Sequence, residues 1–219
     1  MKFTKEEIRK GMLLYAVTDQ SWRKEGQCLL CVCEDVLTSG ATFLQIREKD
    51  LDTGSFAAEA ARLKNLCARF RVPYVVNDSV EVALAIDADG VHVGQSDIKG
   101  RDIRSLIGPD KILGISAGTV EEAIAAENAG ADYIGVGAVF GTSTKMNAHN
   151  LTVEKLKEIS SCVSIPVVAI GGINGKNLME LSGSGVDGVA VVSAIFAAED
   201  PGKATAELLA LAKQMIANG

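Results

Sequence analysis

The stretch VEEAIAAENAGADYIGVGAV, residues 120–139, contains the two structural units that recur along this chain. Its first part, Val120–Asn128, has apolar residues at helical spacing, and Thr119 with Glu122 is typical of a capping box. Its last part, Tyr133–Val139, is apolar at most positions, as expected of a parallel strand that is covered on both faces. The stretch therefore predicts a helix that is followed by a buried strand.

Two other segments resemble the start of that strand. Asp89-Gly-Val-His-Val and Asp187-Gly-Val-Ala-Val are similar to Asp132-Tyr-Ile-Gly-Val, and each follows a helical pattern. Repetition of one strand–helix unit is typical of a barrel. Together with the other short apolar runs, these segments predict eight strands: Leu13–Thr18, Thr42–Arg47, Tyr74–Asn77, Gly90–Val93, Ile112–Ser116, Tyr133–Val139, Val167–Gly171 and Val189–Ser193.

Amphipathic helical segments lie between these strands, as at Phe56–Phe70, Val153–Ser160 and Ala204–Ile216. Thr4 with Glu7 predicts a short helix ahead of the first strand, which would cover one end of a barrel. Eight regular strand–helix units in 219 residues favour closure over an open doubly wound sheet. Because no linker interrupts the pattern, we expect residues 1–219 to form a single (β/α)8 TIM-barrel domain with a short N-terminal helix.

The net charge of −6 argues against nonspecific binding to nucleic acids or anionic membranes, since both need a basic surface. Met1–Lys10 is charged, which argues against a signal peptide, and no apolar run reaches the roughly 18 residues of a membrane span. Five cysteines without a paired framework favour a reducing cytoplasm. The oligomeric state stays open, a homo-oligomer included.

Three cysteines, Cys28, Cys31 and Cys33, lie close together in a helical pattern. Because no second ligand pair accompanies them, we expect small buried hydrophobic residues rather than a metal site. His92 lies inside a predicted strand, where a structural or orienting role is expected. His149 follows a loop and is expected at the surface.

Polar residues follow the carboxyl ends of the predicted strands, and in a barrel all these ends lie on the face that carries the active site. Arg47, Lys49 and Lys145 form a cationic cluster suited to phosphate oxygens. Asp78 and Asp97 suit a hard cation such as Mg²⁺, and Mn²⁺ accepts the same ligands. Together they indicate a metal-chelated polyphosphate; the alternative is ordinary surface charge and strand-end capping.

A second phosphate site is indicated after the last two strands. The Gly171-Gly172 turn lets backbone amides approach a ligand, because no Cβ intervenes. Ser193 begins a short helical segment whose first N–H groups would be further donors. The loops after strands 7 and 8 are the usual phosphate site of this fold. The alternative is that the two glycines only form a tight turn.

The chain resembles the thiamine-phosphate synthase family from Leu14 to Ile195. The matching segments are Tyr15-Ala-Val-Thr-Asp19, Gln45-Ile-Arg-Glu-Lys49, Val76-Asn-Asp78, Gly90-Val-His-Val-Gly-Gln-Ser-Asp97, Gly114-Ile-Ser-Ala117, Thr142-Ser-Thr-Lys145, Ala169-Ile-Gly-Gly-Ile173 and Val192-Ser-Ala-Ile195. The family joins a pyrimidine diphosphate to a thiazole monophosphate and releases pyrophosphate. The resemblance implies a Mg²⁺-dependent transferase of thiamine biosynthesis with a dissociative mechanism.

The resemblance also implies a role for each matching residue. Asp78 and Asp97 are expected to bind Mg²⁺. Arg47, Lys49, Asn77, Ser116 and Lys145 are expected to bind the diphosphate, with Arg47, Lys49, Ser116 and Lys145 acting in catalysis. Gln45 would face the pyrimidine. The thiazole-phosphate pocket would comprise Thr142, Ser143, Thr144, Gly172, Val192 and Ser193.

Two positions depart from the family pattern. Gly141 stands where the family usually has proline, and should make the following loop more mobile. Gly118 stands where the family often has histidine. The alternative functions are a related thiazole tautomerase, another sugar-phosphate barrel enzyme (an epimerase, a decarboxylase or a Schiff-base aldolase), and a non-catalytic phosphate-binding barrel. The tautomerase needs no diphosphate site, and an aldolase would need a lysine inside a strand.

Overall fold

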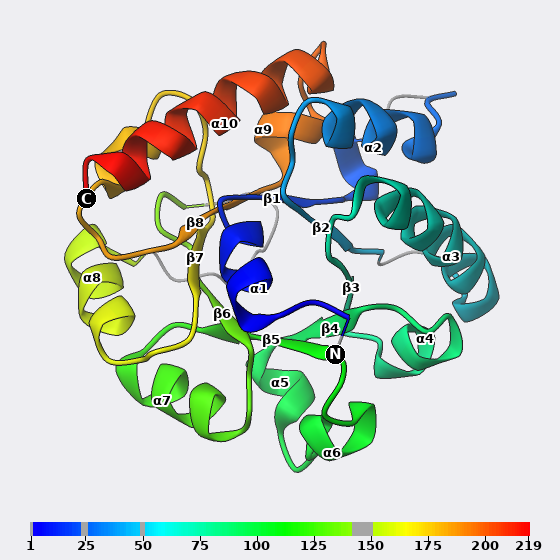
Figure 1. Ribbon diagram of the computed structural model, residues 1–219, viewed down its shortest axis with the longest axis horizontal. Helices are drawn as coiled ribbons and strands as arrows, with labels where there is room; N and C mark the ends of the chain where they lie inside the picture. The colour runs from blue at the N-terminus through cyan, green and yellow to red at the C-terminus, as the bar shows by residue number, and fades with distance from the viewer. Residues whose placement is uncertain (1, 23–25, 49–50, 142–150) are drawn as a thin grey trace.

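The computed structural model describes residues 2–22, 26–48, 51–141 and 151–219. Within them, eight parallel strands close into a barrel in chain order, with the first strand pairing with the last (Figure 1). The strands are β1 (Leu14–Val17), β2 (Phe43–Ile46), β3 (Tyr74–Asn77), β4 (Gly90–Val93), β5 (Ile112–Ala117), β6 (Tyr133–Gly137), β7 (Val167–Ile170) and β8 (Gly188–Val191). The predicted (β/α)8 barrel is confirmed.

Helices surround the barrel. They are α1 (Lys5–Gly11), η1 (Gln20–Trp22), α2 (Leu29–Thr38), α3 (Thr53–Phe70), α4 (Val80–Ala85), α5 (Gln95–Ile98), α6 (Ile103–Ile107), α7 (Val120–Asn128), α8 (Val153–Ser161), η2 (Leu178–Leu181), α9 (Ser193–Phe196) and α10 (Pro201–Ala217). The expectation of an α-helix after every strand is wrong at β7, which is followed by the 3₁₀ turn η2. Glycines at 171, 172, 175, 183 and 185 disfavour a longer helix there. In the described ranges, no helix is long and apolar enough to cross a membrane.

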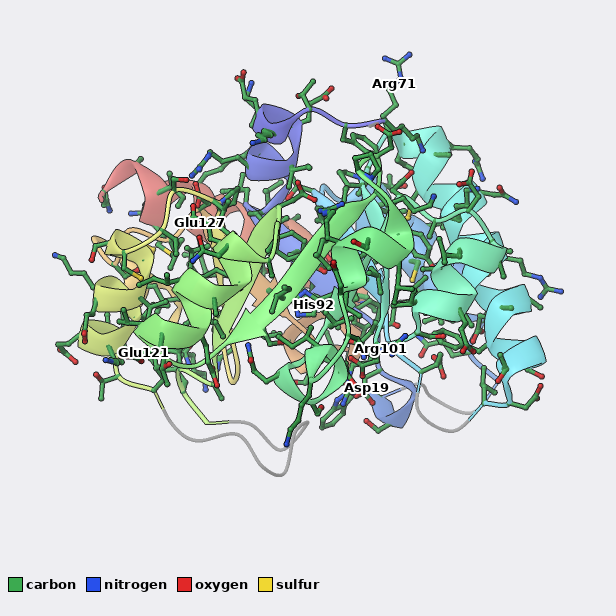
Figure 2. The ribbon with its side chains drawn as sticks, turned by 90° about the horizontal axis from the view of Figure 1, so that it is seen from below. Asp19, Arg71, His92, Arg101, Glu121 and Glu127 are labelled. Atoms are coloured by element: carbon green, nitrogen blue, oxygen red, sulfur yellow. The ribbon has the colours of Figure 1, made fainter. Side chains whose placement is uncertain are left out.

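Helix α1 lies across the amino-terminal end of the barrel (Figures 1 and 2). The capping box predicted for it is present: the Thr4 side chain accepts a hydrogen bond from the Glu7 N–H at 3.2 Å, and the Glu7 carboxylate accepts one from the Thr4 N–H at 2.7 Å. Ile8 and Met12 are buried against the barrel interior. This end is therefore closed, and a ligand enters from the other end.

The box predicted at Thr119 is only half formed. The Thr119 side chain caps α7 by accepting a hydrogen bond from the Glu122 N–H at 3.2 Å. The Glu122 carboxylate accepts from the Gly118 N–H at 2.7 Å rather than from the Thr119 N–H. The prediction failed because Gly118 offers a competing donor one residue earlier.

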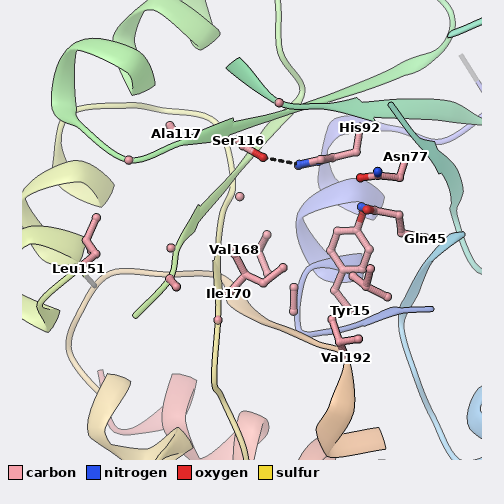
Figure 3. A pocket seen from close by; sticks show the side chains of 18 of the residues that line it. Tyr15, Gln45, Asn77, His92, Ser116, Ala117, Leu151, Val168, Ile170 and Val192 are labelled. Carbon is pink, nitrogen blue, oxygen red and sulfur yellow. Dashed lines mark hydrogen bonds between the residues drawn. The ribbon is translucent and has the colours of Figure 1, made fainter. Parts of the chain in front are cut away.

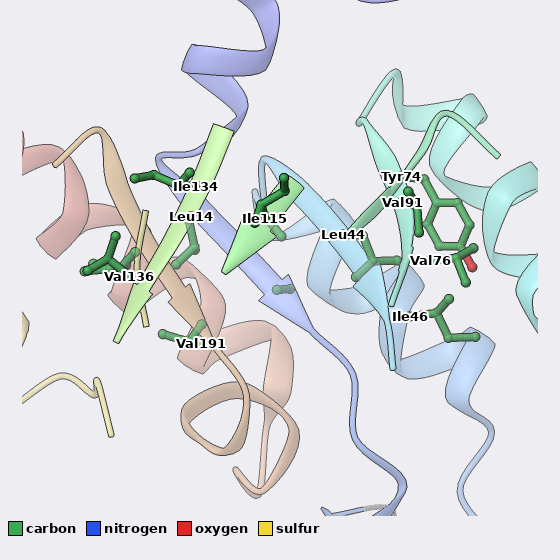
Figure 4. Close-up of a cluster of buried hydrophobic side chains, with 14 of the residues drawn as sticks. Leu14, Leu44, Ile46, Tyr74, Val76, Val91, Ile115, Ile134, Val136 and Val191 are labelled. Atoms are coloured by element: carbon green, nitrogen blue, oxygen red, sulfur yellow. The ribbon is translucent and has the colours of Figure 1, made fainter. Parts of the chain in front are cut away.

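The strand side chains form two hydrophobic layers. Outward-pointing residues such as Leu44, Val76 and Ile134 are fully buried against the helices (Figure 4). Inward-pointing aromatic residues, Phe43 among them, pack with α1 in the barrel interior. Burial on both faces explains why the strands are apolar at consecutive positions.

The aspartates of the three repeated segments have one shared role. Each accepts a hydrogen bond from a backbone N–H at the start of the preceding strand, on its first or second residue: 3.1 Å from Tyr74 to Asp89, 2.8 Å from Leu113 to Asp132, and 2.8 Å from Val167 to Asp187. Thr42 does the same for Leu14, with an N–H···Oγ1 distance of 2.8 Å. These four hydrogen bonds join β1 to β2, β3 to β4, β5 to β6 and β7 to β8.

The cysteines of α2 do not all behave as expected. Cys33 is buried, as predicted, whereas Cys28 and Cys31 are exposed, so the prediction of buried cysteines is wrong for these two. The buried face of α2 runs through Leu29, Val32, Cys33, Val36 and Leu37. Cys31 does not belong to this buried face, and Cys28 is the N-cap residue that precedes the first helical turn.

Candidate active site

A cavity of about 980 Å³ opens at the carboxyl ends of the strands (Figure 3). The predicted site residues that line it are Gln45, Arg47, Asn77, Asp78, Asp97, Ser116, Gly172, Val192 and Ser193. The structure therefore brings together every predicted site residue that it describes. Lys49, Thr142, Ser143, Thr144 and Lys145 lie outside the described residues, as does His149.

A chain of hydrogen bonds crosses the floor of this cavity. The Gln45 side-chain amide donates to the Tyr15 hydroxyl at 2.5 Å, and the Tyr15 and Tyr133 hydroxyl oxygens are 2.8 Å apart. Tyr133 contacts His92 Nδ1 at 3.0 Å, and His92 Nε2 lies 3.0 Å from Ser116 Oγ. The chain links β2, β1, β6, β4 and β5, and Figure 3 shows Gln45, Tyr15, His92 and Ser116 around the cavity.

The direction of this chain is set by the orientation of the Gln45 amide. With Gln45 Nε2 donating to Tyr15, the Tyr15 hydroxyl donates to Tyr133, and Tyr133 donates to His92 Nδ1. His92 then carries its proton on Nε2 and donates it to Ser116 Oγ. In this arrangement the Ser116 hydroxyl proton is available to a ligand in the cavity.

Burial keeps the two tyrosines protonated. Desolvation raises the pKa of Tyr15 and of Tyr133 well above the ordinary range, so both act as neutral hydroxyls. Gly114 leaves room for the network, because a Cβ there would lie 2.2 Å from Tyr133 and 2.5 Å from His92 Nδ1. The orienting role expected for His92 is consistent with this geometry. Tyr15 and Tyr133 were not predicted as site residues. The alternation of side chains along each strand could have indicated that both point into the barrel.

Replacing Tyr133 by phenylalanine is expected to lower both stability and turnover. It removes the acceptor of the Tyr15 hydroxyl and the donor to His92, which should cost about 1–3 kcal/mol in the free energy of unfolding. Urea denaturation and steady-state kinetics would measure the two effects. Tyr74→Phe is the matched control, because the buried Tyr74 hydroxyl donates to the Ala60 carbonyl at 3.0 Å outside the cavity. Equal turnover in the two variants would contradict a role for the network in the site.

Two carboxylates meet at one side of the cavity. Asp78 follows β3 in a left-handed conformation (φ 62°), and its carboxylate accepts from the Asn77 amide at 2.6 Å. Asp97 lies on α5 and accepts from the Gly94 N–H at 2.9 Å. Burial, and then the neighbouring Asp97 carboxylate, raise the pKa of Asp78 above its ordinary value. The two carboxylates repel each other, and a cation bound between them would offset that repulsion.

Arg47 makes a buried ion pair with Asp19 beside these carboxylates. Nη1 of Arg47 contacts Oδ2 of Asp19, and the two side chains are only 13% and 11% exposed. The Arg47 backbone N–H donates to Thr18 Oγ1 at 3.0 Å. Asp19 belongs to a matching segment, but the sequence assigned it no role. It holds Arg47 at the edge of the cavity.

The Gly171-Gly172 turn borders the opposite side of the cavity. Gly172 has φ +67°, and a Cβ there would lie 2.1 Å from the Gly141 carbonyl oxygen. Asn174 and Asn177 each donate a side-chain hydrogen bond to the Gly172 carbonyl at 3.0 Å. The glycine is thus needed for the tight turn itself. Its place in the cavity lining agrees with the predicted phosphate site as well.

Gly172→Ala is expected to destabilise the protein by roughly 2–5 kcal/mol, because backbone strain adds to a collision with another backbone segment. Gly183→Ala is the control: it has a similar φ of +73°, but nothing lies within 4 Å of its Cβ position. Strain alone should then cost about 1–2 kcal/mol. Thermal and urea unfolding would separate the two variants, and equal losses would rule out the collision.

The family model described as thiamine monophosphate synthase matches residues 14–195, which include all eight strands. The chain belongs to the thiamine monophosphate synthase family. It is 48% identical to the thiamine-phosphate synthase of Clostridioides difficile over 199 residues, which cover 91% of this chain and 94% of the relative. It is 47% identical to that of Methanobrevibacter smithii over 196 residues, covering 90% and 93%.

A solved structure supports the same assignment. The thiamine phosphate pyrophosphorylase of Pyrococcus furiosus is 39% identical and superposes with a TM-score of 0.86, covering 95% of this chain and 99% of that protein. The resemblance predicted from sequence is therefore confirmed at the level of the family. Membership in the thiamine monophosphate synthase family also identifies the chain as a transferase enzyme.

Proposed function

We propose that this chain is a thiamine-phosphate synthase: it transfers the hydroxymethylpyrimidine group from its diphosphate to thiazole monophosphate, releasing pyrophosphate and thiamine phosphate. The observation that carries this proposal is one cavity with two halves of different chemistry. One half has Arg47, Ser116 and two carboxylates, and the other has the Gly172 turn and Ser193. A volume near the top of the usual range of roughly 300–1,000 Å³ suits two small ligands held side by side.

Asp78 and Asp97 fit Mg²⁺, and equally Mn²⁺, because their neighbouring carboxylates line one cavity and repel one another without a cation. The described residues contain no cluster of three or more histidine, cysteine, aspartate or glutamate ligands. Mg²⁺ is commonly bound by one or two carboxylates plus substrate phosphates. When bound, the ion neutralises charge on the diphosphate.

The protein's own side chains would stabilise the leaving group. Arg47 offers a fork of N–H donors to the diphosphate oxygens, and Asp19 fixes its orientation. Ser116 donates the hydroxyl proton that the His92 network leaves available. Asn77 contributes a side-chain amide at the end of β3. These donors act where charge develops as pyrophosphate departs, which is the arrangement that lowers a dissociative barrier.

Capture of the pyrimidine methylene cation by the thiazole nitrogen then needs only proximity and orientation. Gln45, anchored on the Tyr15 hydroxyl at 2.5 Å, would hold the pyrimidine ring. Gly172, Val192 and Ser193 would bind the thiazole phosphate from β7 and β8. No general base is required, which is compatible with Gly118 in place of a histidine.

The remaining predicted ligands lie outside the described residues. We retain Lys49 and Lys145 as diphosphate ligands, and Thr142, Ser143 and Thr144 as thiazole-phosphate ligands, on the matching sequence alone. We further infer one domain over residues 1–219, because α1 and α10 at the two ends of the chain both pack on the closed barrel. A cytoplasmic location and substrates that are free small molecules are consistent with this assignment.

Incubation with the pyrimidine diphosphate, the thiazole phosphate and Mg²⁺ tests the proposal directly. Equal amounts of pyrophosphate and thiamine phosphate should form, and an excess of EDTA should stop both. A folded protein that forms neither product would overturn the proposal. Isomerisation of the thiazole phosphate without coupling would instead support the tautomerase alternative.

A further inference from the structure

The segment Cys28-Leu-Leu-Cys31 lies outside the cavity lining, and the proposed function does not use it. Both thiols are free and exposed. Cys28 occupies the N-cap of the ten-residue helix α2, and Cys31 is its third helical residue. Two cysteines separated by two residues at a helix start are the arrangement of dithiol redox centres.

Helix geometry brings these two side chains together. The side chain of an N-cap residue points at the third helical residue, and the side chain of that residue points back, as in a capping box. Cys28 has the extended backbone (φ −79°, ψ 113°) that this geometry requires. The two thiols contact each other directly across this turn, as the two thiols of an intramolecular disulfide must.

The surroundings make the two thiols unequal. The Cys31 thiol and, after it, the Cys31 backbone N–H hold the pKa of Cys28 below its ordinary value, although the Glu59 carboxylate opposes this. Cys28 raises the pKa of Cys31, and the Glu34 and Asp35 carboxylates add to that effect. Cys28 also lies at the N-cap of α2, where the positive end of the helix dipole favours a thiolate. We therefore assign Cys28 as the attacking thiol and Cys31 as the thiol that completes the disulfide.

The other three cysteines lack these properties. Cys33 and Cys67 are buried, and burial raises the pKa of both. Cys162 is partly exposed, and its thiol donates to the Ile159 carbonyl at 3.0 Å. The C-x-x-C pair is therefore distinct from the remaining thiols in exposure, spacing and helix position.

We propose that Cys28 and Cys31 form a redox-active dithiol, which a low-molecular-weight disulfide converts into an intramolecular disulfide. The Cys28 thiolate attacks one sulfur of that disulfide, so that a mixed disulfide forms and one small thiolate leaves. Cys31 then loses its proton to water and attacks the Cys28 sulfur, which releases the second small thiolate. Both cysteines are oxidised, and the small disulfide is reduced to two thiols.

Oxidised glutathione is the probe for this reaction. The reduced full chain would be incubated with it, quenched in acid and digested without reductant for mass spectrometry. The expected product is a peptide that contains Cys28 and Cys31 and has lost two hydrogens. Iodoacetamide labelling of the untreated chain should modify Cys28 fastest, on the order of tenfold faster than the buried Cys33 or Cys67. This labelling needs no variant and is independent of refolding.

Single variants resolve the order of the steps. Cys31→Ser should retain glutathione on Cys28, because no second thiol displaces it. Cys28→Ser should react on the order of tenfold more slowly than Cys31→Ser, since the remaining thiol is more protonated. Cys162→Ser is the control and should form the internal disulfide as the parent does. A lasting glutathione adduct on the parent chain, or equal labelling of all five cysteines, would overturn the dithiol.

Discussion

Asp78→Ala should lower kcat by a factor of roughly 10²–10³, by analogy with the loss of one strong transition-state contact. Asp78 and Asp97 are two neighbouring carboxylates in the cavity lining, and one of them alone offers too few oxygen ligands to hold a metal–diphosphate complex. Asp97→Ala should have an effect of the same size for the same reason. Steady-state rates over a range of Mg²⁺ concentrations measure both losses.

Glu199→Ala is the control for the acidic pair, because it removes an exposed carboxylate outside the cavity. It should keep the parent's rate and the parent's Mg²⁺ dependence. Asp78→Asn preserves the shape of the side chain but not its charge, and should lose nearly as much activity as the alanine variant. Full activity of Asp78→Asn with unchanged Mg²⁺ dependence would refute a metal role for Asp78.

Arg47→Ala should lose both activity and stability. It removes the donor fork that faces the diphosphate, and it leaves the Asp19 carboxylate, which is only 11% exposed, without its cation. An unpaired buried charge of this kind costs about 3–5 kcal/mol in the free energy of unfolding. Turnover should fall by roughly 10²–10³ as well, as for other lost leaving-group donors. Urea denaturation and kinetics record the two losses separately.

The double variant Asp19→Ala/Arg47→Ala distinguishes the two roles of the arginine. Removing both partners eliminates the unpaired charge, so most of the lost stability should return. Activity should not return, because the donor to the diphosphate is still missing. Asp19→Ala alone should keep part of the activity, since Arg47 remains but is less well oriented. Recovery of turnover in the double variant would show that Arg47 acts only through folding.

The sequence predicted the barrel because its strand signal is local. Runs such as Tyr133–Val139 are buried on both faces, so their apolar pattern is visible without knowledge of the fold. The strand end was less certain, and β6 stops at Gly137. Residues such as Asp78 and Ser116 were also predictable, because a barrel places every carboxyl strand end on one face.

Long-range partners could not be predicted in the same way. The contact of Tyr15 with Tyr133 joins residues 118 positions apart, and it depends on which side chains point inward at the same level of the barrel. Asp19 was overlooked because its partner Arg47 follows a different strand, β2. The exposure of Cys31 depended on which face of α2 turns inward, and the cluster of cysteines obscured the helical spacing of the apolar residues.

The four hydrogen bonds accepted by Thr42, Asp89, Asp132 and Asp187 group the eight strands into four neighbouring pairs. Each bond stays within one pair of neighbouring strands, so a chain opened between two pairs, after β2, β4 or β6, would keep all four. Circular permutants with new termini at those points should close their barrels as the parent does. A permutant opened between β3 and β4 would separate Asp89 from the strand start it holds. The same strand pairs are natural units for recombination with related barrels.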